Sequence, residues 1–292
     1  MLGVFTSITL QMKRVHSGLL NVHAWNVPDL ETHLHAIAEA ALTHNYTVGW
    51  LDATARGKGL GRGQLHTADY LAEGEDPDAS RTLRVEYQTL PDKFFGLLPK
   101  SLLHFFMGPF MNNLGTWGVN TGKYILGRRE KTYRQPHAAF HFLLDYVPNW
   151  ELAYGRLIQY QSFLPKETAL AAWTEVLSLS HRRSLPSYLA VTKRHRPDGF
   201  LLSHAVDGLS LALDFKVTDS NRPRLAQMLQ DFDRIVLEAG GRFYFAKNSE
   251  TRPETAARFL GEETVAKFRA LKKRCDPNGL LESDLFRRVF AQ

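Results

Sequence analysis

Two glutamines on one predicted strand are the residues best suited to bind a polar ligand. Gln159 and Gln161 flank Tyr160 in the apolar run 157–164, which predicts a β-strand. Side chains two residues apart project from the same face of a strand, so both amides are expected on one side. Paired amides offer several donors and acceptors, which suits a ligand with many hydroxyl groups. A solvent-facing polar strand would show the same spacing.

Lys247 is the second candidate for chemistry. It follows the stretch 242–245, an aromatic run that predicts another strand. A lysine at the end of a buried strand could approach an anionic or electron-rich group. A surface lysine is the alternative, and the pattern alone does not separate the two.

The common signatures of hydrolysis and metal binding are missing. The sequence has neither a GxSxG nor an HExxH pattern, and Cys275 is its single cysteine, which excludes cysteine clusters and intrachain disulfides. His137 and His141 have a spacing that suits metal ligation on a helix. However, residues 138–146 have the pattern of a strand or turn, and no acidic third ligand is near. We therefore expect no metal site.

The second half of the chain predicts the α+β arrangement that would position these residues. Alternating and helical patterns follow one another as strand, helix, strand, strand, helix and strand, over 157–164, 167–182, 188–193, 208–217, about 221–239 and 242–245. This order predicts a ferredoxin-like β-α-β-β-α-β unit, in which helices flank an antiparallel sheet. A last helix is expected over 262–274.

The first half is less regular. Strands are expected over 4–13, 19–24 and 47–51, with a helix between Pro28 and about His44. The basic, glycine-rich stretch 56–63 suggests a phosphate loop, but it lacks the GxxxxGK[ST] pattern, so we expect a hairpin or loop.

Residues 91–135 are apolar and show no sustained period, which predicts an irregular segment. Such a segment could form a lid over a lipid-like substrate, a peripheral membrane contact through 94–117, or a loop packed on the core.

Composition and charge set broad limits. The 292 residues are 44% hydrophobic and 23% charged, as in an ordinary globular protein of one large or two smaller domains. A formal net charge of +6 could suit an anionic partner, but it is small for a chain of this size. We see no signal peptide or transmembrane pattern, and expect a cytoplasmic chain with at most peripheral membrane contact. No nucleic-acid-binding motif is present, so no nucleic-acid partner is expected.

The stretch 157–165 resembles the substrate-site strand of FAD-linked oxidases of the vanillyl-alcohol-oxidase superfamily, closest to the decaprenylphosphoryl-ribose 2-oxidoreductases and aldonolactone oxidases. Further motifs carry the resemblance: Leu144-Asp145, Trp150, Tyr154-Gly155, the stretch 240–247, Asp276-Pro277-Asn278-Gly279 and the ending 285–288. The resemblance covers essentially the whole chain.

The resemblance implies roles for particular residues. Gln159 and Gln161 would bind substrate, and Lys247, the expected catalytic residue, would reach both substrate and flavin. Tyr244 would contact the flavin. Three further positions are expected in the substrate pocket, where the ribose oxidases carry tyrosine, asparagine and cysteine; here they are His141, Ser210 and Ala212. Because these three differ, the expected substrate is a sugar-like, lactone or other secondary alcohol rather than lipid-linked ribose specifically.

The resemblance also implies a division of the chain. Residues 1–14 resemble the end of a FAD-binding domain, with Val4 at a flavin-contacting position. Residues 15–250 would form the substrate domain, with 91–135 as its lid, and 251–292 a C-terminal helix and tail that return to the FAD domain. Most of the FAD site is expected outside this chain, which would then be a fragment, a wrongly assigned start, or part of a split enzyme that needs the FAD domain in cis or in trans.

The implied reaction is hydride transfer from a CH–OH carbon to flavin N5, while a nearby base takes the hydroxyl proton. Two alternatives stay open. One is a non-catalytic remnant that binds no flavin. The other is a basic nucleic-acid-binding protein, which only the net charge and the stretch 56–63 suggest.

Overall fold

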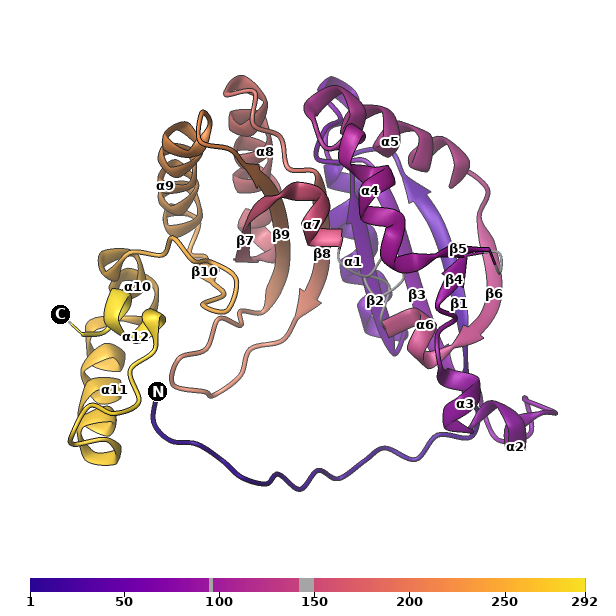
Figure 1. Cartoon of the computed structure of the whole chain (residues 1–292), viewed down its shortest axis with the longest axis horizontal. Helices are drawn as coiled ribbons and strands as arrows, with labels where there is room; N and C mark the ends of the chain where they lie inside the picture. Colours follow the sequence, from indigo (N-terminus) through magenta and orange to yellow (C-terminus); the bar gives the residue numbers. More distant parts are fainter. Residues whose placement is uncertain (95–96, 142–149, 292) are drawn as a thin grey trace.

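An eight-stranded antiparallel sheet forms the centre of the computed structural model, which describes residues 1–94, 97–141 and 150–291 (Figure 1). The strands follow the order β10-β7-β9-β8-β2-β3-β1-β6. Their bounds are β1 (Leu19–Val27), β2 (Tyr46–Leu51), β3 (Gly63–Tyr70), β6 (Lys131–Pro136), β7 (Arg156–Pro165), β8 (Leu189–His195), β9 (Gly208–Val217) and β10 (Arg242–Phe243). The predicted α+β class is confirmed.

The C-terminal half is the predicted ferredoxin-like unit. Its elements run β7, α8 (Lys166–Arg182), β8, β9, α9 (Arg222–Glu238) and β10, and its strands lie in the order β10-β7-β9-β8. The alternating run 208–217 coincides with β9. This prediction is therefore confirmed.

The N-terminal half repeats the same strand order. Here the elements are β1, α1 (Leu30–Thr43), β2, β3 and β6, and the strand order β2-β3-β1-β6 corresponds to that of the second unit. The two units join edge to edge, because β2 pairs with β8 and places Trp50 opposite Val191. This duplication has no sequence signal, because the two halves share a strand order without a visible sequence repeat.

The main core lies where α1, α8 and α9 pack on one face of the sheet. Side chains from α8, α9 and β9 fill it, among them Trp173, Phe232 and Phe215. Trp173 is fully buried, and its indole N–H donates to Ser162 Oγ at 3.0 Å. This hydrogen bond ties α8 to β7, the strand whose opposite face carries Gln159 and Gln161.

The prediction of an irregular segment over 91–135 was wrong for its described residues. They form β4 (Lys93–Phe94), β5 (Leu98–Pro99), η2 (Lys100–Leu102), α4 (Leu103–Met107), η3 (Gly108–Phe110), α5 (Asn113–Leu126) and most of β6. Three glycines in α5 weaken its helical signal, because glycine is a poor helix former. The Asn112 side chain caps the helix by accepting the N–H of Gly115 at 2.9 Å. A tertiary contact also holds it, as Asn26 of β1 donates to the Tyr124 carbonyl.

The predicted strand over 4–13 was also wrong. This segment is extended but pairs with no strand in the described part of the chain, and its apolar residues are exposed. Alternation produces a strand only where a neighbouring edge accepts its hydrogen bonds. Met1 and Leu2 pack against the main core, and the segment then runs past the sheet towards β1 (Figure 1).

The remaining elements are short or C-terminal. They are η1 (Gly57–Gly59), α2 (Ala79–Thr82), α3 (Val85–Gln88), α6 (His137–His141), α7 (Trp150–Tyr154), α10 (Pro253–Leu260), α11 (Glu262–Cys275) and α12 (Asp284–Val289). The expected hairpin or loop at 56–63 is the connection between β2 and β3, with η1 inside it.

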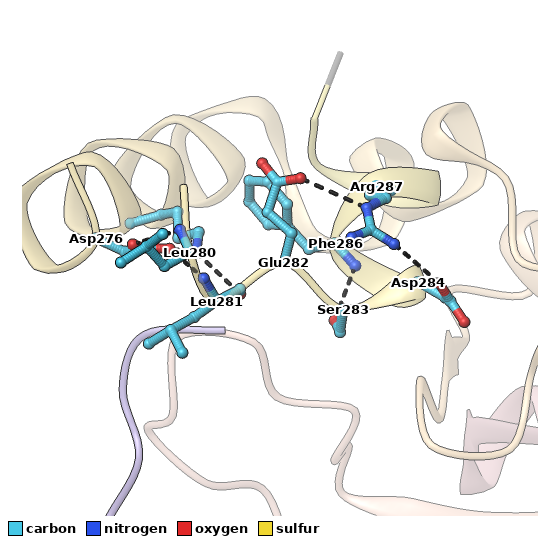
Figure 2. A network of polar contacts seen from close by, with 9 residues as sticks. Asp276, Leu280, Leu281, Glu282, Ser283, Asp284, Phe286 and Arg287 are labelled. Carbon is cyan, nitrogen blue, oxygen red and sulfur yellow. Dashed lines mark hydrogen bonds and ion pairs between the residues drawn. The ribbon is translucent and has the colours of Figure 1, made fainter. Parts of the chain in front are cut away.

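The Asp276-Pro277-Asn278-Gly279 motif forms the turn after α11. The Asp276 carboxylate pairs with Lys272 and accepts the backbone N–H groups of Leu280 and Leu281, each at 2.8 Å (Figure 2). These hydrogen bonds lower the pKa of Asp276 to about 2, and the bond from Lys272 has the largest effect. The motif thus builds a turn that leads the chain into α12. That this end returns to a FAD domain stays a prediction, as do the other domain boundaries.

Candidate functional site

The two predicted glutamines lie on the face of the sheet opposite α8 and α9. Gln159 is paired in register with Asp214 of β9, and its Nε2 donates to Asp214 Oδ1 at 3.1 Å. Gln161 lies opposite Ala212 and donates to Ser210 Oγ at 3.2 Å. Four of the expected substrate-binding residues therefore share one face, as the alternation of both strands requires.

The segment after β10 brings Lys247 to the same face. The N–H groups of Lys247 and Asn248 both donate to the Tyr244 carbonyl, at 3.0 and 2.9 Å, and so form a tight turn. Asn248 Oδ1 accepts the backbone N–H of Gln161 at 2.7 Å, which fixes this turn beside β7. The Nδ2 of Asn248 is buried and has no hydrogen-bond partner in the described residues. The structure thus places Gln159, Gln161 and Lys247 together.

Two charged residues that the sequence analysis missed belong to this group. Asp214 is only 4% exposed, and burial raises its pKa to about 6, although the Gln159 hydrogen bond and nearby Lys247 oppose the rise. Lys193 of β8 is paired in register with Ser210. The residue as a whole is exposed, but partial desolvation of its ammonium group, and after that the nearby Lys247, lower its pKa. Asp214 follows Ser210 and Ala212 at intervals of two residues in the alternating run, so the sequence indicated that it lies on the same face of the strand. Lys193 could not be identified from the sequence, because only the pairing of β8 with β9 places it beside Ser210.

Aromatic and histidine rings border the group. The rings of Tyr244 and His204 lie 4.6 Å apart, and Phe163 packs against His204 at 4.6 Å and His195 at 4.7 Å. Burial lowers the pKa of His195 to about 4, and the charge of nearby His204 contributes to this shift, so the His195 imidazole is neutral at pH 7. His195 Nε2 and Ser210 Oγ share a hydrogen bond of 2.8 Å. This packing holds Tyr244 beside the turn that carries Lys247.

The structure does not bring His141 to this group. His141 ends α6, on the N-terminal unit, and its ring lies 4.5 Å from that of Tyr46. Trp50 of β2 and Gln161 of β7 lie at the same level of the sheet, with β8 and β9 between them. Tyr46 lies four residues before Trp50 on β2. Strand spacings place Tyr46 roughly 20 Å from Gln161. The strand or turn expected at 138–146 was wrong for residues 138–141, which are helical.

Val4 lies in the exposed N-terminal segment and is itself 79% exposed. His137 and His141 have ring centroids 6.3 Å apart, and no group of three metal-ligating side chains exists among the described residues. Leu144-Asp145, two residues that carried the family resemblance, lie outside the described residues.

A ligand can reach this face from solvent. Gln159, Tyr244 and Lys247 are half-buried, and Lys193 is exposed. The face offers amides for hydroxyl groups, two ammonium groups for negative charge, and a carboxyl group that titrates close to neutral pH. These are the parts needed to hold a polyhydroxylated molecule and to accept a proton from it.

Comparisons with known proteins found several relatives, among them the following two. The chain is 30% identical over 254 residues to the decaprenylphosphoryl-β-D-ribose oxidase of Mycolicibacterium smegmatis, an alignment that covers 84% of this chain and 51% of the relative. It is 26% identical over 314 aligned positions to an uncharacterized protein in the mprA 5′ region of Streptomyces coelicolor, covering 98% of this chain and 77% of that protein. No family model matches the chain. The chain thus spans about half the length of the oxidase it resembles.

Proposed function

We propose that this chain is the substrate-side part of a FAD-dependent oxidoreductase that oxidises the CH–OH group of a sugar-like or lactone substrate. The observation that carries this proposal is the convergence of Gln159, Gln161 and Lys247 beside Asp214. The similarity to an oxidase named for a ribose-containing substrate supports it. We place the activity in the vanillyl-alcohol-oxidase superfamily, with D-arabinono-1,4-lactone oxidase and decaprenylphosphoryl-ribose oxidase as the nearest activities.

The residues present fit a flavin ring. The ring has carbonyl oxygens and gains negative charge on reduction, and positive groups near it tune its electronics. Lys247 and Lys193 supply two such groups, and the Asn248 Nδ2 is a buried donor without a partner among the described residues. Tyr244 supplies an aromatic surface beside them. A bound flavin would provide the hydride acceptor, and we propose that most of its site lies in a FAD-binding domain outside these 292 residues.

The glutamine amides would orient the substrate. Gln159 and Gln161 project side by side, so each can hold a different hydroxyl group of one sugar ring. Ser210 and Ala212 lie beside the glutamines on the neighbouring strand, and both are buried, with Ser210 Oγ hydrogen-bonded to Gln161 and His195. The Lys247 ammonium would hold the reacting oxygen and stabilise the negative charge that develops on it.

Asp214 is the group we propose as proton acceptor. A general base works best when its pKa lies near the working pH, and burial raises the pKa of Asp214 to about 6. Below this pH the carboxyl group is protonated and cannot take a proton, so kcat/KM is expected to rise with pH and level off above about 6. Asp214→Asn should lower kcat/KM by about 100-fold or more and remove this dependence. Retention of the same pH profile in Asp214→Asn would show that another group titrates.

Titration of the purified protein with FAD tests the cofactor. The protein together with the FAD-binding domain that we propose is expected to perturb the visible flavin spectrum, and a double Lys193→Ala, Lys247→Ala variant should weaken this binding. Lys267→Ala is the matched control, because Lys267 is exposed on α11 and pairs with Glu263. No flavin binding by the full-length gene product would favour the non-catalytic alternative instead.

A further inference from the structure

An exposed apolar surface covers α4, η3 and α5, which pack through Met107 and Met111 near Leu157 at the start of the glutamine strand. We call it the α4–α5 surface. Its members are large apolar side chains between 50% and 81% exposed: Phe105, Phe106, Phe110, Leu114, Trp117, Val119, Ile125 and Leu126. Isolated exposed apolar residues are ordinary, but a gathering of this size on neighbouring short elements indicates an interaction surface.

The segment that carries this surface has charges of one sign. From Lys93 to Arg129 the sequence contains no aspartate or glutamate, although it contains several basic residues. Arg128 and Arg129 follow directly after α5, and both are exposed. Most protein surfaces mix acidic and basic groups, so an apolar segment whose own charges are all basic favours a partner that is apolar inside and negatively charged outside.

A basic pocket of about 680 Å³ adjoins the same surface. Leu114 and Trp117 of α5 line one side of it, and Arg56 and Arg62 of the β2–β3 connection line another. Arg62 is held by Asp52, with contacts of 2.9 and 3.0 Å, whereas Arg56 is exposed and has no ion pair among the described residues. Arg56 is therefore available to an anionic group that enters the pocket.

The glycines of this connection do not form a phosphate nest. The backbone N–H groups of Gly59, Leu60 and Arg62 are used within the turn, where they donate to the carbonyls of Arg56, Gly57 and Gly59. An anion in the pocket would be held by arginine side chains rather than by backbone amides. His181 adds no charge at pH 7, because burial lowers its pKa.

We propose that the α4–α5 surface docks on an anionic lipid bilayer, with its aromatic side chains in the interfacial region and a headgroup phosphate beside Arg56. Apolar insertion combined with basic contacts is the usual basis of interfacial binding. A second copy of this chain fits less well, because a symmetric contact would bring the basic borders of both copies together. Among the described residues, no helix is both long and apolar enough to span a bilayer. Docking does not depend on flavin binding.

Vesicle co-sedimentation tests this proposal. The protein is expected to bind vesicles of phosphatidylcholine with phosphatidylglycerol, to bind phosphatidylcholine alone much less, and to release as salt rises. A double Arg56→Ala, Lys58→Ala variant should lower partitioning into anionic vesicles by about 30-fold. A double Phe105→Ser, Phe106→Ser variant should lower it by about tenfold or more.

Two controls match these variants. Phe200 is 79% exposed in the connection between β8 and β9, and Arg234 is exposed on α9, so Phe200→Ser and Arg234→Ala should leave partitioning unchanged. In the wild-type protein, brominated lipid should quench tryptophan fluorescence. In Trp117→Phe, most of this quenching should be lost. Equal binding to neutral and anionic vesicles, or equal losses in the controls, would overturn the proposal. The proposal would also be overturned if the wild-type protein is a dimer in solution and the double Phe105→Ser, Phe106→Ser variant is a monomer.

Discussion

Replacement of Lys247 by alanine in the full-length gene product is expected to lower kcat by about 100- to 1,000-fold, the usual cost of losing one preorganised electrostatic group. Lys247 is half-buried in the turn that Asn248 fixes beside β7, next to Lys193 and Asp214. Its positive charge acts on both Asp214 and Lys193, and Asp214 is hydrogen-bonded to Gln159. Steady-state kinetics with a sugar or aldonolactone substrate, together with a melting curve, measures both effects.

The unfolding free energy of Lys247→Ala should stay within about 0.5 kcal/mol of wild type, because the substitution leaves the core and the Asn248 hydrogen bonds unchanged. Lys247→Arg keeps the charge but changes the donor geometry, so partial activity is expected. Lys267→Ala serves as the exposed-lysine control. Wild-type turnover in Lys247→Ala would remove this residue from the proposed reaction.

Replacement of Trp173 by alanine is expected to lower the free energy of unfolding by about 3–5 kcal/mol, as for other large aromatic side chains removed from a core. Trp173 is fully buried between α8 and the sheet. The substitution also leaves Ser162 Oγ without the indole N–H that donates to it at 3.0 Å. Since Ser162 adjoins Gln161 on β7, the glutamine pair should become less well ordered. Urea unfolding measures the stability change.

Trp173→Phe separates packing from hydrogen bonding. It keeps most of the buried ring and removes only the N–H donor, so a loss of about 0.5–1.5 kcal/mol from the bond is expected, plus a smaller packing term. If Trp173→Ala and Trp173→Phe destabilise the protein equally, packing of α8 on β7 does not anchor the sheet as we describe.

The C-terminal unit was predictable because its signals are local. Residues 208–217 alternate strictly, and a strand with two buried faces needs little more than that to be identified. The helix α9 carries an apolar stripe that includes Leu225, Met228 and Phe232, all buried against the sheet. Order and type of these elements together specify the ferredoxin-like unit.

The errors arose where stability comes from distant contacts. The helix α5 contains Gly115, Gly118 and Gly122, so its sequence has little helical preference, and the Asn112 cap and the contact from Asn26 hold it in place. The segment 4–13 alternates like a strand but finds no pairing edge in the described chain. The repeat of one strand order in both halves likewise has no local signal.

By itself, the sequence determined the antiparallel α+β unit and the shared side of Gln159 and Gln161, because a period of two is a property of one strand. Only the tertiary structure decided which residues join them. Strand register added Asp214 and Lys193, and the turn at Asn248 added Lys247. The same packing placed His141 on the other unit. Register and packing depend on contacts between residues far apart in the chain, which no local pattern records.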